Sequence, residues 1–410
     1  MSGPELITLG CRLNFAESEA MRTLAGNRDD LVIVNSCAVT GEAVRKTRQQ
    51  IRKAKKARPD AEIVVTGCAA QIDPGSFSAM PEVTRVLGNR EKMLPESFAA
   101  ERDLVSDIMA VRETAPHLVT GFADRARAFV EVQNGCDHRC TFCVIPYGRG
   151  NSRSVPAGLV VERIKALVDE GFQEVVLTGV DVTSYGPDLP GSPSLGMLVE
   201  RILKGVPTLR RLRLSSLDSI EIDERLFAII TGEPRFMPHL HLSLQAGDDM
   251  ILKRMKRRHS REQSVEMVAK LKDARPEIAI GADMIAGFPT ETEAMAENTL
   301  RLVDDCDIVH GHIFPYSART GTPAAKMPQM PMPVRRERAQ KLREACARRK
   351  TAWLEGLVGS RQRVLVERGD GTGHGESFAE VQIAGSPVPG SVVEVRVTGA
   401  ENGGLIGEAA

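Results

Sequence analysis

The sequence lacks three features that would assign it to a class at once. No window approaches the run of about 18 apolar residues that a membrane-spanning helix needs, so we expect no membrane span. The opening MSGPELITLG has no charged segment followed by a long apolar one, so it does not match a secretory signal peptide and a cytoplasmic protein is expected. Lysine plus arginine equals aspartate plus glutamate at 54 each, so net charge excludes no class of partner.

Local charge is less even than the total. Residues 45–58, RKTRQQIRKAKKAR, carry eight basic side chains and no acidic one, and residues 253–261 and 335–350 are also basic. Each run alone could be an ordinary solvated helix face. Three such runs in a neutral protein favour a polyanionic partner, with nucleic acid as the main candidate.

Eight cysteines in a chain without secretory features are typical of metal or catalytic thiols rather than of disulfides. One loop, NGCDHRCTFCVIPYGRG (134–150), holds Cys136, Cys140 and Cys143 and no fourth cysteine. Structural zinc needs a fourth ligand, which His138 could supply. A four-iron cluster held by only three cysteines instead leaves one iron open to a substrate or cofactor.

The first of three regions, residues 1–125, alternates apolar and helical stretches. Its apolar runs are short and end at a glycine or cysteine: 5–10, 30–37 and 61–68. This alternation predicts a doubly wound parallel sheet. One cysteine stands at or just past the end of each run: Cys11, Cys37 and Cys68. In an open α/β sheet this is the edge at which ligands bind.

The second region, residues 126–350, alternates more regularly. Strands are predicted near 128–134, 174–178, 211–216, 239–244, 278–285 and 308–314. Helices are predicted within 155–172, 195–204, 221–230, 261–274 and 293–304. Six strand–helix units in succession predict a partial (β/α)6 barrel of parallel strands. The three-cysteine loop follows the first strand, at the end of the barrel that carries the chemistry in such folds.

The third region, residues 351–410, has short alternating runs, RVLVER, FAEVQI and SVVEVRVTG, split by glycine- and proline-rich turns. This pattern predicts a small antiparallel β-barrel. Barrels of this size bind single-stranded or structured RNA. From composition alone, a plain structural cap is an equally good interpretation.

The spacing C-x3-C-x-aromatic-C, with Phe142 as the aromatic residue, resembles the radical S-adenosylmethionine (SAM) superfamily. The resemblance implies that an open iron chelates the amino and carboxylate groups of SAM. Electron transfer then cleaves the sulfonium and releases a 5′-deoxyadenosyl radical, while the protein supplies orientation and exclusion of water. Phe142 would pack near the adenine.

Four stretches extend the resemblance over nearly the whole chain to the methylthiotransferase family: TLGC (8–11), NSCAVT (35–40), TGCAAQ (66–71) and GCDHRCTFCVIPYGRG (135–150). By this resemblance Cys11, Cys37 and Cys68 hold a second four-iron cluster, whose open iron carries the sulfur that is transferred. The last region resembles the family's RNA-binding TRAM domain. The stretch between Cys11 and Cys37 is shorter than in the family, which we interpret as a shortened helix.

Members of this family act on isopentenyladenosine or threonylcarbamoyladenosine in tRNA, or on an aspartate of ribosomal protein S12. TLGCRLN, LTGVDVTSYG, HLHLSLQAG, LKRMKRRHS and IFPYSARTGTPA resemble the threonylcarbamoyladenosine branch. The implied product is the 2-methylthio derivative, 3′ of the anticodon. The carboxylate of this substrate calls for a cationic residue in the pocket. Three arginines in the predicted rim loops are candidates, although each could equally form a salt bridge within the barrel: Arg149, Arg153 and Arg319.

The resemblance and the predicted strand ends also suggest SAM contacts: Phe142, Thr178, Gly179, Asp181, Ser215, Ser216, Gln245, Ile285 and Gly287. Gly179 and Gly287 are expected to let the backbone approach the cofactor closely. The implied cofactors are two [4Fe-4S] clusters and SAM. The implied partners are tRNA, an electron donor and a sulfur donor, with no membrane partner and a monomer favoured.

Some residues receive a structural interpretation. His239 and His241, like His310 and His312, are spaced i, i+2 on predicted strands, and we expect packed or hydrogen-bonded roles rather than metal binding. Cys306 and Cys346 match no ligand position and are predicted to be structural thiols. One hypothesis from another class stays open, a non-catalytic iron–sulfur or zinc RNA-binding module that does not cleave SAM.

Overall fold

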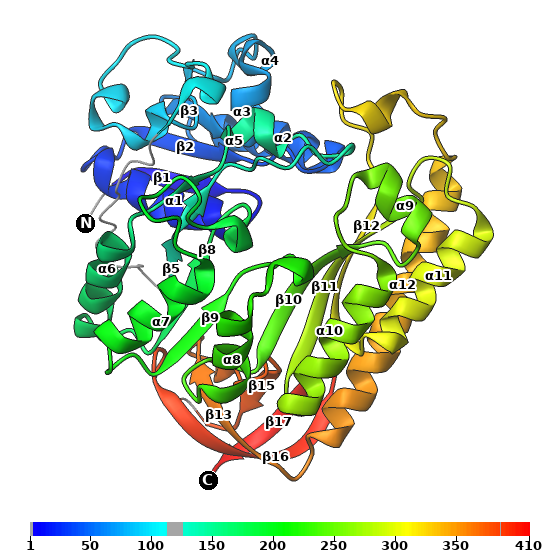
Figure 1. Ribbon diagram of the computed structural model, residues 1–410. Helices are drawn as coiled ribbons and strands as arrows, with labels where there is room; N and C mark the ends of the chain where they lie inside the picture. The colour runs from blue at the N-terminus through cyan, green and yellow to red at the C-terminus, as the bar shows by residue number, and fades with distance from the viewer. Residues whose placement is uncertain (1–2, 113–125, 386) are drawn as a thin grey trace.

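The computed structural model describes residues 3–112, 126–385 and 387–410, and it divides into three layers (Figure 1). The N-terminal sheet contains β1 (Glu5–Thr8), β2 (Leu31–Ser36), β3 (Glu62–Gly67) and β4 (Arg85–Val86). All three pairings are parallel, in the order β1-β2-β3-β4. In the described part of the chain no helix is long and apolar enough to cross a bilayer.

Helices cover both faces of this sheet, as the doubly wound prediction requires. Successive strand residues point to opposite faces. Leu31 and Ile33 share a core cluster with Met21 of α1 (Arg12–Leu24). Val32 and Val34 share another with Ile51 of α2 (Gly41–Ala57). The helices therefore bury alternate residues of the same strand.

The middle layer is a partial barrel of six parallel strands, which confirms the sequence prediction. Its strands are β5 (Arg127–Glu131), β8 (Glu174–Thr178), β9 (Arg211–Leu214), β10 (His239–Gln245), β11 (Ala279–Ala286) and β12 (Ile308–Pro315). They form two three-stranded sheets that isolated bridges join, Leu212 to Phe236 and Leu217 to Leu242. Among the described strands none pairs β12 with β5, so the barrel is open on that side.

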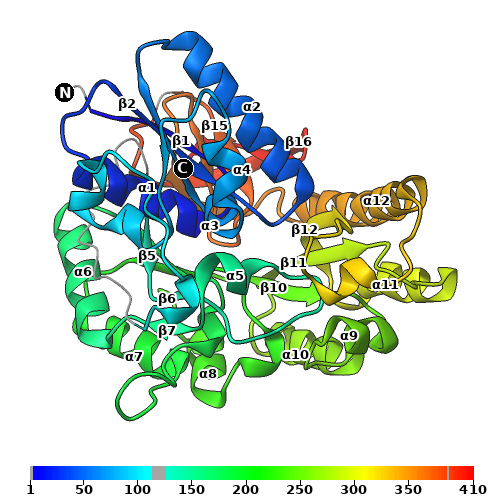
Figure 2. The ribbon, with the colours of Figure 1, turned by 90° about the horizontal axis from the view of Figure 1, so that it is seen from above.

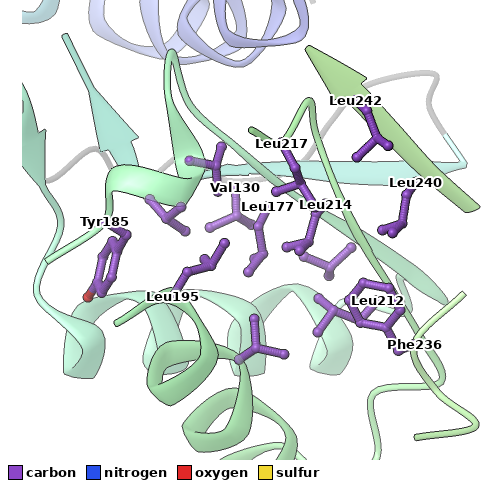
Figure 3. Close-up of a cluster of buried hydrophobic side chains, with 14 of the residues drawn as sticks. Val130, Leu177, Tyr185, Leu195, Leu212, Leu214, Leu217, Phe236, Leu240 and Leu242 are labelled. Carbon is purple, nitrogen blue, oxygen red and sulfur yellow. The ribbon is translucent and has the colours of Figure 1, made fainter. Parts of the chain in front are cut away.

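An outer ring of helices surrounds the partial barrel when it is seen from above (Figure 2). These helices are α6 (Ala157–Asp169), α7 (Leu195–Gly205), α8 (Glu224–Gly232), α10 (Arg261–Ala274), α11 (Glu293–Asp305) and α12 (Met332–Gly356). The outward face of the strands is apolar and packs on the helices, as Leu177, Leu212 and Leu214 show (Figure 3). Burial of each such leucine contributes roughly 1.5–3 kcal/mol.

The inward face of the same strands is polar. Arg127, Glu174 and Arg213 alternate with apolar residues that face the helices, and all three are buried. Glu174 is 0% exposed and lies 2.9 to 3.0 Å from the guanidinium groups of Arg127, Arg211 and Arg213. Burial alone would raise the pKa of Glu174, but these arginines lower it to about 2. The glutamate is therefore ionised, and its ion pairs link β8 to β5 and β9 at this end of the barrel interior.

The C-terminal layer is a closed barrel of β13 (Arg361–Val366), β14 (Thr372–His374), β15 (Glu380–Ile383), β16 (Val392–Glu401) and β17 (Gly404–Ala409). Its pairings are antiparallel except for β15 with β17, which are parallel. A small core of valine, leucine and isoleucine side chains fills it. This confirms the predicted small barrel.

The C-terminal barrel docks on the N-terminal end of the partial barrel (Figure 1). Phe378, in the turn between β14 and β15, stacks on His239 with ring centroids 4.9 Å apart. The guanidinium groups of Arg127 and Arg213 lie 5.1 Å from the Phe378 ring centroid. Arg213 also donates hydrogen bonds to the backbone carbonyls of residues 375 and 376. One aromatic ring thus closes the end of the barrel opposite to the cysteine loop.

Candidate functional site

The three-cysteine loop begins where β5 ends and is held in shape by backbone contacts. After β6 (Gln133–Asn134), Gly135 adopts a φ of +73°, and a Cβ there would clash with the carbonyl of Asn151. Cys136 N–H donates to the Gly150 carbonyl at 3.1 Å. The loop then runs into α5 (Ile145–Arg149). Its two ends are therefore fastened together beneath the thiols.

The thiols of Cys136, Cys140 and Cys143 form one group. Burial is the main cause that raises the pKa of Cys136, and it raises that of Cys143 to about 12, with the other thiols adding to the shift. The thiols of Cys136 and Cys143 therefore stay protonated until a metal cation replaces their protons. Three partly buried, clustered thiols fit an iron–sulfur cluster that keeps one iron without a protein ligand.

His138 does not complete a zinc site with these thiols. Its Nε2 lies 2.9 Å from Oδ2 of Asp181 and 2.9 Å from Nη2 of Arg258. The hydrogen bond to Asp181 raises the pKa of His138. Asp181 in turn lies 3.7 Å from the Cys136 sulfur. His138 therefore orients the Asp181 carboxylate next to the loop. The geometry does not support a zinc ion held by His138 and the three cysteines.

A second group of thiols lies at the edge of the N-terminal sheet. Cys11 and Cys37 follow β1 and β2, and Cys68 begins α3 (Cys68–Ile72) directly after β3. Burial raises the pKa of Cys37 to about 11, and Cys68 and Cys11 add to the shift. At Gly10, with φ +104°, a Cβ would lie 3.1 Å from the Cys37 sulfur. The three strand ends therefore bring these thiols together, as predicted.

Arg149 connects the two groups. At the end of α5 it is 2% exposed, and its Nε donates to the Cys68 sulfur at 3.1 Å. Its other nitrogens bond Glu17 and Asn14 of α1. A Cβ at Gly148 would lie 3.1 Å from Cys68 Cβ, so this glycine lets α5 approach α3 closely. The predicted substrate contact of Arg149 is wrong, because these partners occupy its guanidinium.

The other two arginines proposed for the substrate differ from each other. Arg153 is buried and donates to the carbonyls of Asn151 and Arg149 at 2.9 and 3.0 Å, so its role is to hold the loop rather than to bind substrate. Arg319 lies close to Gly41 and to Cys37. Its Nε is buried and has no hydrogen-bond partner among the described residues. The substrate contact stays a prediction for Arg319 alone.

The residues predicted to contact SAM lie at or near the C-terminal ends of the barrel strands, which leaves their binding role a prediction: Phe142, Thr178, Gly179, Asp181, Ser215, Ser216, Gln245, Ile285 and Gly287. The Ser215 hydroxyl is buried without a hydrogen-bond partner among the described residues. Gln245 ends β10 with a φ of +66°. The unpaired Ser215 hydroxyl and the left-handed backbone at Gln245 are both compatible with a polar ligand at this rim.

The two rim glycines are required by close neighbours in the chain, while their approach to a cofactor stays a prediction. A Cβ at Gly179 would lie 2.6 Å from the Gln133 carbonyl oxygen, and one at Gly287 would lie 2.9 Å from Cα of Arg335. Each glycine thus makes room for another part of the chain. A neighbouring segment is therefore sufficient to require the missing side chain at each position.

Arg257 was missed as a site residue because it lies in the basic run 253–261. Its Nη2 lies 2.9 Å from Oδ2 of Asp218 and 2.8 Å from the Ser243 carbonyl, and its Nη1 lies 3.9 Å from the Cys140 sulfur. Its charge therefore faces the thiols of the loop. No sequence signal distinguishes it from the neighbouring arginine, since only the fold decides which one turns inward.

In the basic runs 253–261 and 335–350, several arginines form ion pairs within the protein. These arginines are therefore not free to contact a polyanion in the way that the sequence had suggested. Arg258 and Arg261 pair with Glu221 and Asp305, and on α12 Arg338 pairs with Glu291 at 2.7 Å. The run on α2 differs. Three of its lysines are exposed and form no ion pair with any described residue: Lys46, Lys53 and Lys56.

The barrel interior holds a further group, of which the sequence indicated the two histidines but not Asp283. His241 Nε2 and His312 Nδ1 lie 3.1 and 3.2 Å from Oδ1 of Asp283. Burial opposes ionisation, but hydrogen bonds from the two imidazoles lower the pKa of Asp283. Arg12 reaches the same interior, where burial and Arg127 lower its pKa and Asp283 opposes them. The hydrogen-bonded role expected for these histidines agrees with this geometry.

Comparison with known proteins identifies the family. Residues 130–303 match the Radical SAM superfamily, and residues 5–88 match a family described as Uncharacterized protein family UPF0004. The radical SAM methyltransferase TsrM of Kitasatospora setae, solved with cobalamin and a [4Fe-4S] cluster, is similar with a TM-score of 0.57 and 14% identity. The likeness covers 79% of this chain and 77% of that one and shows the fold alone.

Three relatives of known name align over most of their length. The threonylcarbamoyladenosine tRNA methylthiotransferase MtaB of Rickettsia prowazekii is 50% identical over 97% of this chain and 96% of its own. The enzyme of the same name from Bacillus subtilis is 38% identical over 82% of this chain and 78% of its own. The tRNA-2-methylthio-N(6)-dimethylallyladenosine synthase of Erythrobacter litoralis is 33% identical over 98% and 96%. The chain therefore belongs to the methylthiotransferase family of radical SAM enzymes.

Proposed function

We propose that this protein converts N6-threonylcarbamoyladenosine, 3′ of the anticodon in tRNA, to its 2-methylthio derivative. The observation that carries the proposal is the joining of two three-cysteine groups through Arg149 and the α3–α5 contact. An enzyme that only cleaves SAM needs one such group. The relative from Rickettsia prowazekii, at 50% identity, supports the choice of substrate.

The residues present fit two [4Fe-4S] clusters. Cys136, Cys140 and Cys143 would hold the first, and Cys11, Cys37 and Cys68 the second. When bound, the first cluster supplies the electron that cleaves SAM to methionine and a 5′-deoxyadenosyl radical, and the second supplies the sulfur. In the net reaction the hydrogen on C2 of the adenine is replaced by a methylthio group. One SAM provides the methyl group and a second ends as 5′-deoxyadenosine.

The chain's own residues would orient these partners and exclude water. Arg257 and Asp181 lie against the thiols of the SAM loop on two sides, at 3.9 and 3.7 Å. Arg149 brings a buried positive charge to the second group, where thiolates would gather negative charge. The guanidinium of Arg149 stays in place because its partner Glu17 is also paired with Lys92, whose Nζ lies 2.7 Å from Oε2 of Glu17. A buried charge network of this kind limits rearrangement around both groups.

The tRNA would bind through the exposed lysines of α2 and through the C-terminal barrel. The inner face of α2 packs on β2 and β3, and its Ile51 belongs to the same core cluster as Cys68. Binding through phosphate contacts would be sensitive to salt. An anticodon-loop base is already outside a regular duplex, so it can enter the open barrel without a large unpairing cost. The sulfur donor and electron donor are expected to be separate molecules, and a monomer in the cytoplasm is favoured.

Nucleoside mass spectrometry tests the substrate. In tRNA from a strain that lacks this protein, we expect the 2-methylthio-threonylcarbamoyl nucleoside to disappear and its unmethylthiolated precursor to accumulate. Loss of the isopentenyl-type methylthio nucleoside instead, with the threonylcarbamoyl type intact, would assign the protein to the other tRNA branch. No change in either would leave ribosomal protein S12 as the substrate to test by peptide mass.

Anaerobic reconstitution tests the alternative of a non-catalytic RNA-binding module. Two four-iron clusters predict about eight irons and eight sulfides per chain. The reconstituted protein should release 5′-deoxyadenosine from SAM when it is reduced. One bound zinc, no inorganic sulfide and no SAM cleavage would support the module and contradict the proposed function.

A further inference from the structure

One arginine inside the partial barrel has no ion pair or hydrogen bond with any described residue. Arg12 begins α1, directly after Cys11, and its guanidinium carbon lies 5.7 Å from the Phe378 ring centroid. The like charge of Arg127 on β5 and the opposite charges of Glu174 on β8 and Asp283 on β11 all act on its guanidinium. These residues belong to opposite halves of the barrel, so the Arg12 side chain extends from the N-terminal sheet into the interior between them.

The interior wall that carries Asp283 is polar, and His312 on this wall is open to solvent. The strand register places Asp283 directly beside His312, and both imidazoles of the cluster contact the Asp283 carboxylate. Nδ1 of His312 faces that carboxylate, while its side chain is 61% exposed. Its second ring nitrogen is therefore available. A Cβ at Gly281 would lie 2.5 Å from Nδ1 of His241, so the glycine keeps space for this ring.

We propose that this interior layer receives the threonylcarbamoyl group of the substrate adenosine, with its carboxylate on Arg12 and its neighbouring polar atoms against His312. The inference rests on the proposed function and names the residues that select its substrate. An unpaired guanidinium in a partly desolvated interior is a strong partner for a carboxylate, because charge-assisted hydrogen bonds gain strength away from water.

The same residues would reject an apolar substituent. An isopentenyl group in this layer would cover the Arg12 guanidinium and the Asp283–His312 pair without bonding them. Leaving such groups buried and unpaired is costly, and this cost discriminates more strongly than a missing apolar contact does. Arg12 also adjoins Cys11, so one helix start carries both a thiol of the second group and the residue that would identify the base to be modified.

A pair of synthetic anticodon stem-loop RNAs tests this inference. The two differ only at the end of the modification, which is a threonine carboxylate in one and the carboxamide in the other. We expect the reconstituted full-length protein to prefer the carboxylate RNA by about 10- to 100-fold in kcat/KM, measured by nucleoside mass spectrometry. Arg12→Gln should abolish the preference, and Arg12→Lys should recover part of it. Arg22→Gln, an exposed arginine on the same helix, is the matched control and should behave as wild type.

Binding provides a second readout that does not require turnover. The ratio of the dissociation constants of the two RNAs should fall toward one in Arg12→Gln, and it remains measurable if that variant takes up less iron. If wild-type protein modifies an isopentenyladenosine stem-loop and not the carboxylate RNA, the proposed function fails. If wild type modifies the carboxylate RNA and Arg12→Gln retains the full preference in both readouts, the inference alone is wrong. A divalent ion that co-purifies with the chain and is lost in Asp283→Asn would also overturn it, because the cluster would then be a metal site.

Discussion

Nε of Arg149 lies 3.1 Å from the sulfur of Cys68, across the contact between the N-terminal sheet and the SAM loop. The same guanidinium bonds Glu17 and Asn14. Burial alone would raise the pKa of Glu17, but Arg149 and Lys92 lower it to about 2. The Arg149 side chain thus links the Cys68 thiol, at the edge of the N-terminal sheet, to α5, the helix that follows the three-cysteine loop.

Replacing Arg149 by lysine should therefore damage methylthiolation more than SAM cleavage. A lysine keeps the charge but lacks the planar fork that serves three partners at once. We expect methylthiolation to fall more than about tenfold, while 5′-deoxyadenosine formation by the SAM loop persists. Both products can be measured in one reaction by mass spectrometry. Arg22→Lys is the control on α1, and equal losses of both activities in Arg149→Lys would contradict a role at the second thiol group.

Single cysteine variants should separate the two groups. Cys140→Ala should abolish 5′-deoxyadenosine formation, whereas Cys68→Ala should retain it and lose the methylthiolated product. Each variant should bind about four irons instead of about eight. Cys306→Ala removes a buried thiol away from both groups and should leave the iron count unchanged. Continued SAM cleavage by Cys140→Ala would refute the assignment of the first cluster.

Glu174 should make stability depend on acid. Its pKa is lowered from 4.5 to about 2, so its contribution is fully present above pH 4.5 and is lost as the pH falls toward 2. That shift corresponds to about 3 kcal/mol of folding free energy. Glu174→Gln should be less stable than wild type at pH 7, and the gap should narrow as the pH approaches 2. Urea unfolding at several pH values measures both effects, and a gap that stays constant with pH would contradict the ion-pair explanation.

Phe378→Ala should loosen the docking of the C-terminal barrel without unfolding it. The ring is half-buried, stacks on His239 and lies 5.1 Å from two guanidinium carbons, so its removal should cost up to about 3 kcal/mol, the low end of the range for a fully buried phenylalanine. Hydrogen exchange should rise in the turn between β14 and β15 and at the starts of β5 and β9. Val388→Ala, at a side chain that is 71% exposed in the same barrel, should cause no such change.

The lysines on α2 should account for part of the salt dependence of tRNA binding. In the triple variant Lys46→Gln, Lys53→Gln, Lys56→Gln, the slope of log affinity against log salt should decrease by about 2–3 if each lysine meets one phosphate. A matched control replaces three exposed lysines of the outer helices: Lys165, Lys204 and Lys270. Equal slopes for the two triple variants would place the tRNA elsewhere.

The strands, the helices of the barrel and both cysteine groups could be predicted because their signals are local. Apolar runs of strand length and thiols at fixed spacings need no knowledge of distant residues. The role of Arg149 could not be predicted in the same way. Its partners are Glu17 and Cys68, far away in the sequence, and a buried arginine has the same appearance in the sequence as one on a loop surface.

The polar interior of the barrel was hidden for a similar reason. Arg211 and Arg213 fall in a strand whose alternate residues are apolar, which indicates only that one face is not packed on helices. Their partner Glu174 begins a different strand, and Phe378 comes from the C-terminal barrel. The glycines show the same limit, since Gly179 and Gly287 are required by close neighbours that only the folded chain brings near.

The docking of the Phe378 turn also fixes the distance between the C-terminal barrel and the cysteine groups. The ion pair between Arg127 and Glu367 and the stacked ring of Phe378 hold the C-terminal barrel at one end of the partial barrel, and the three-cysteine loop lies at the other end. An RNA that touches both must span a constant distance. The enzyme would then select an adenosine by its position along the stem-loop as well as by the group that it carries.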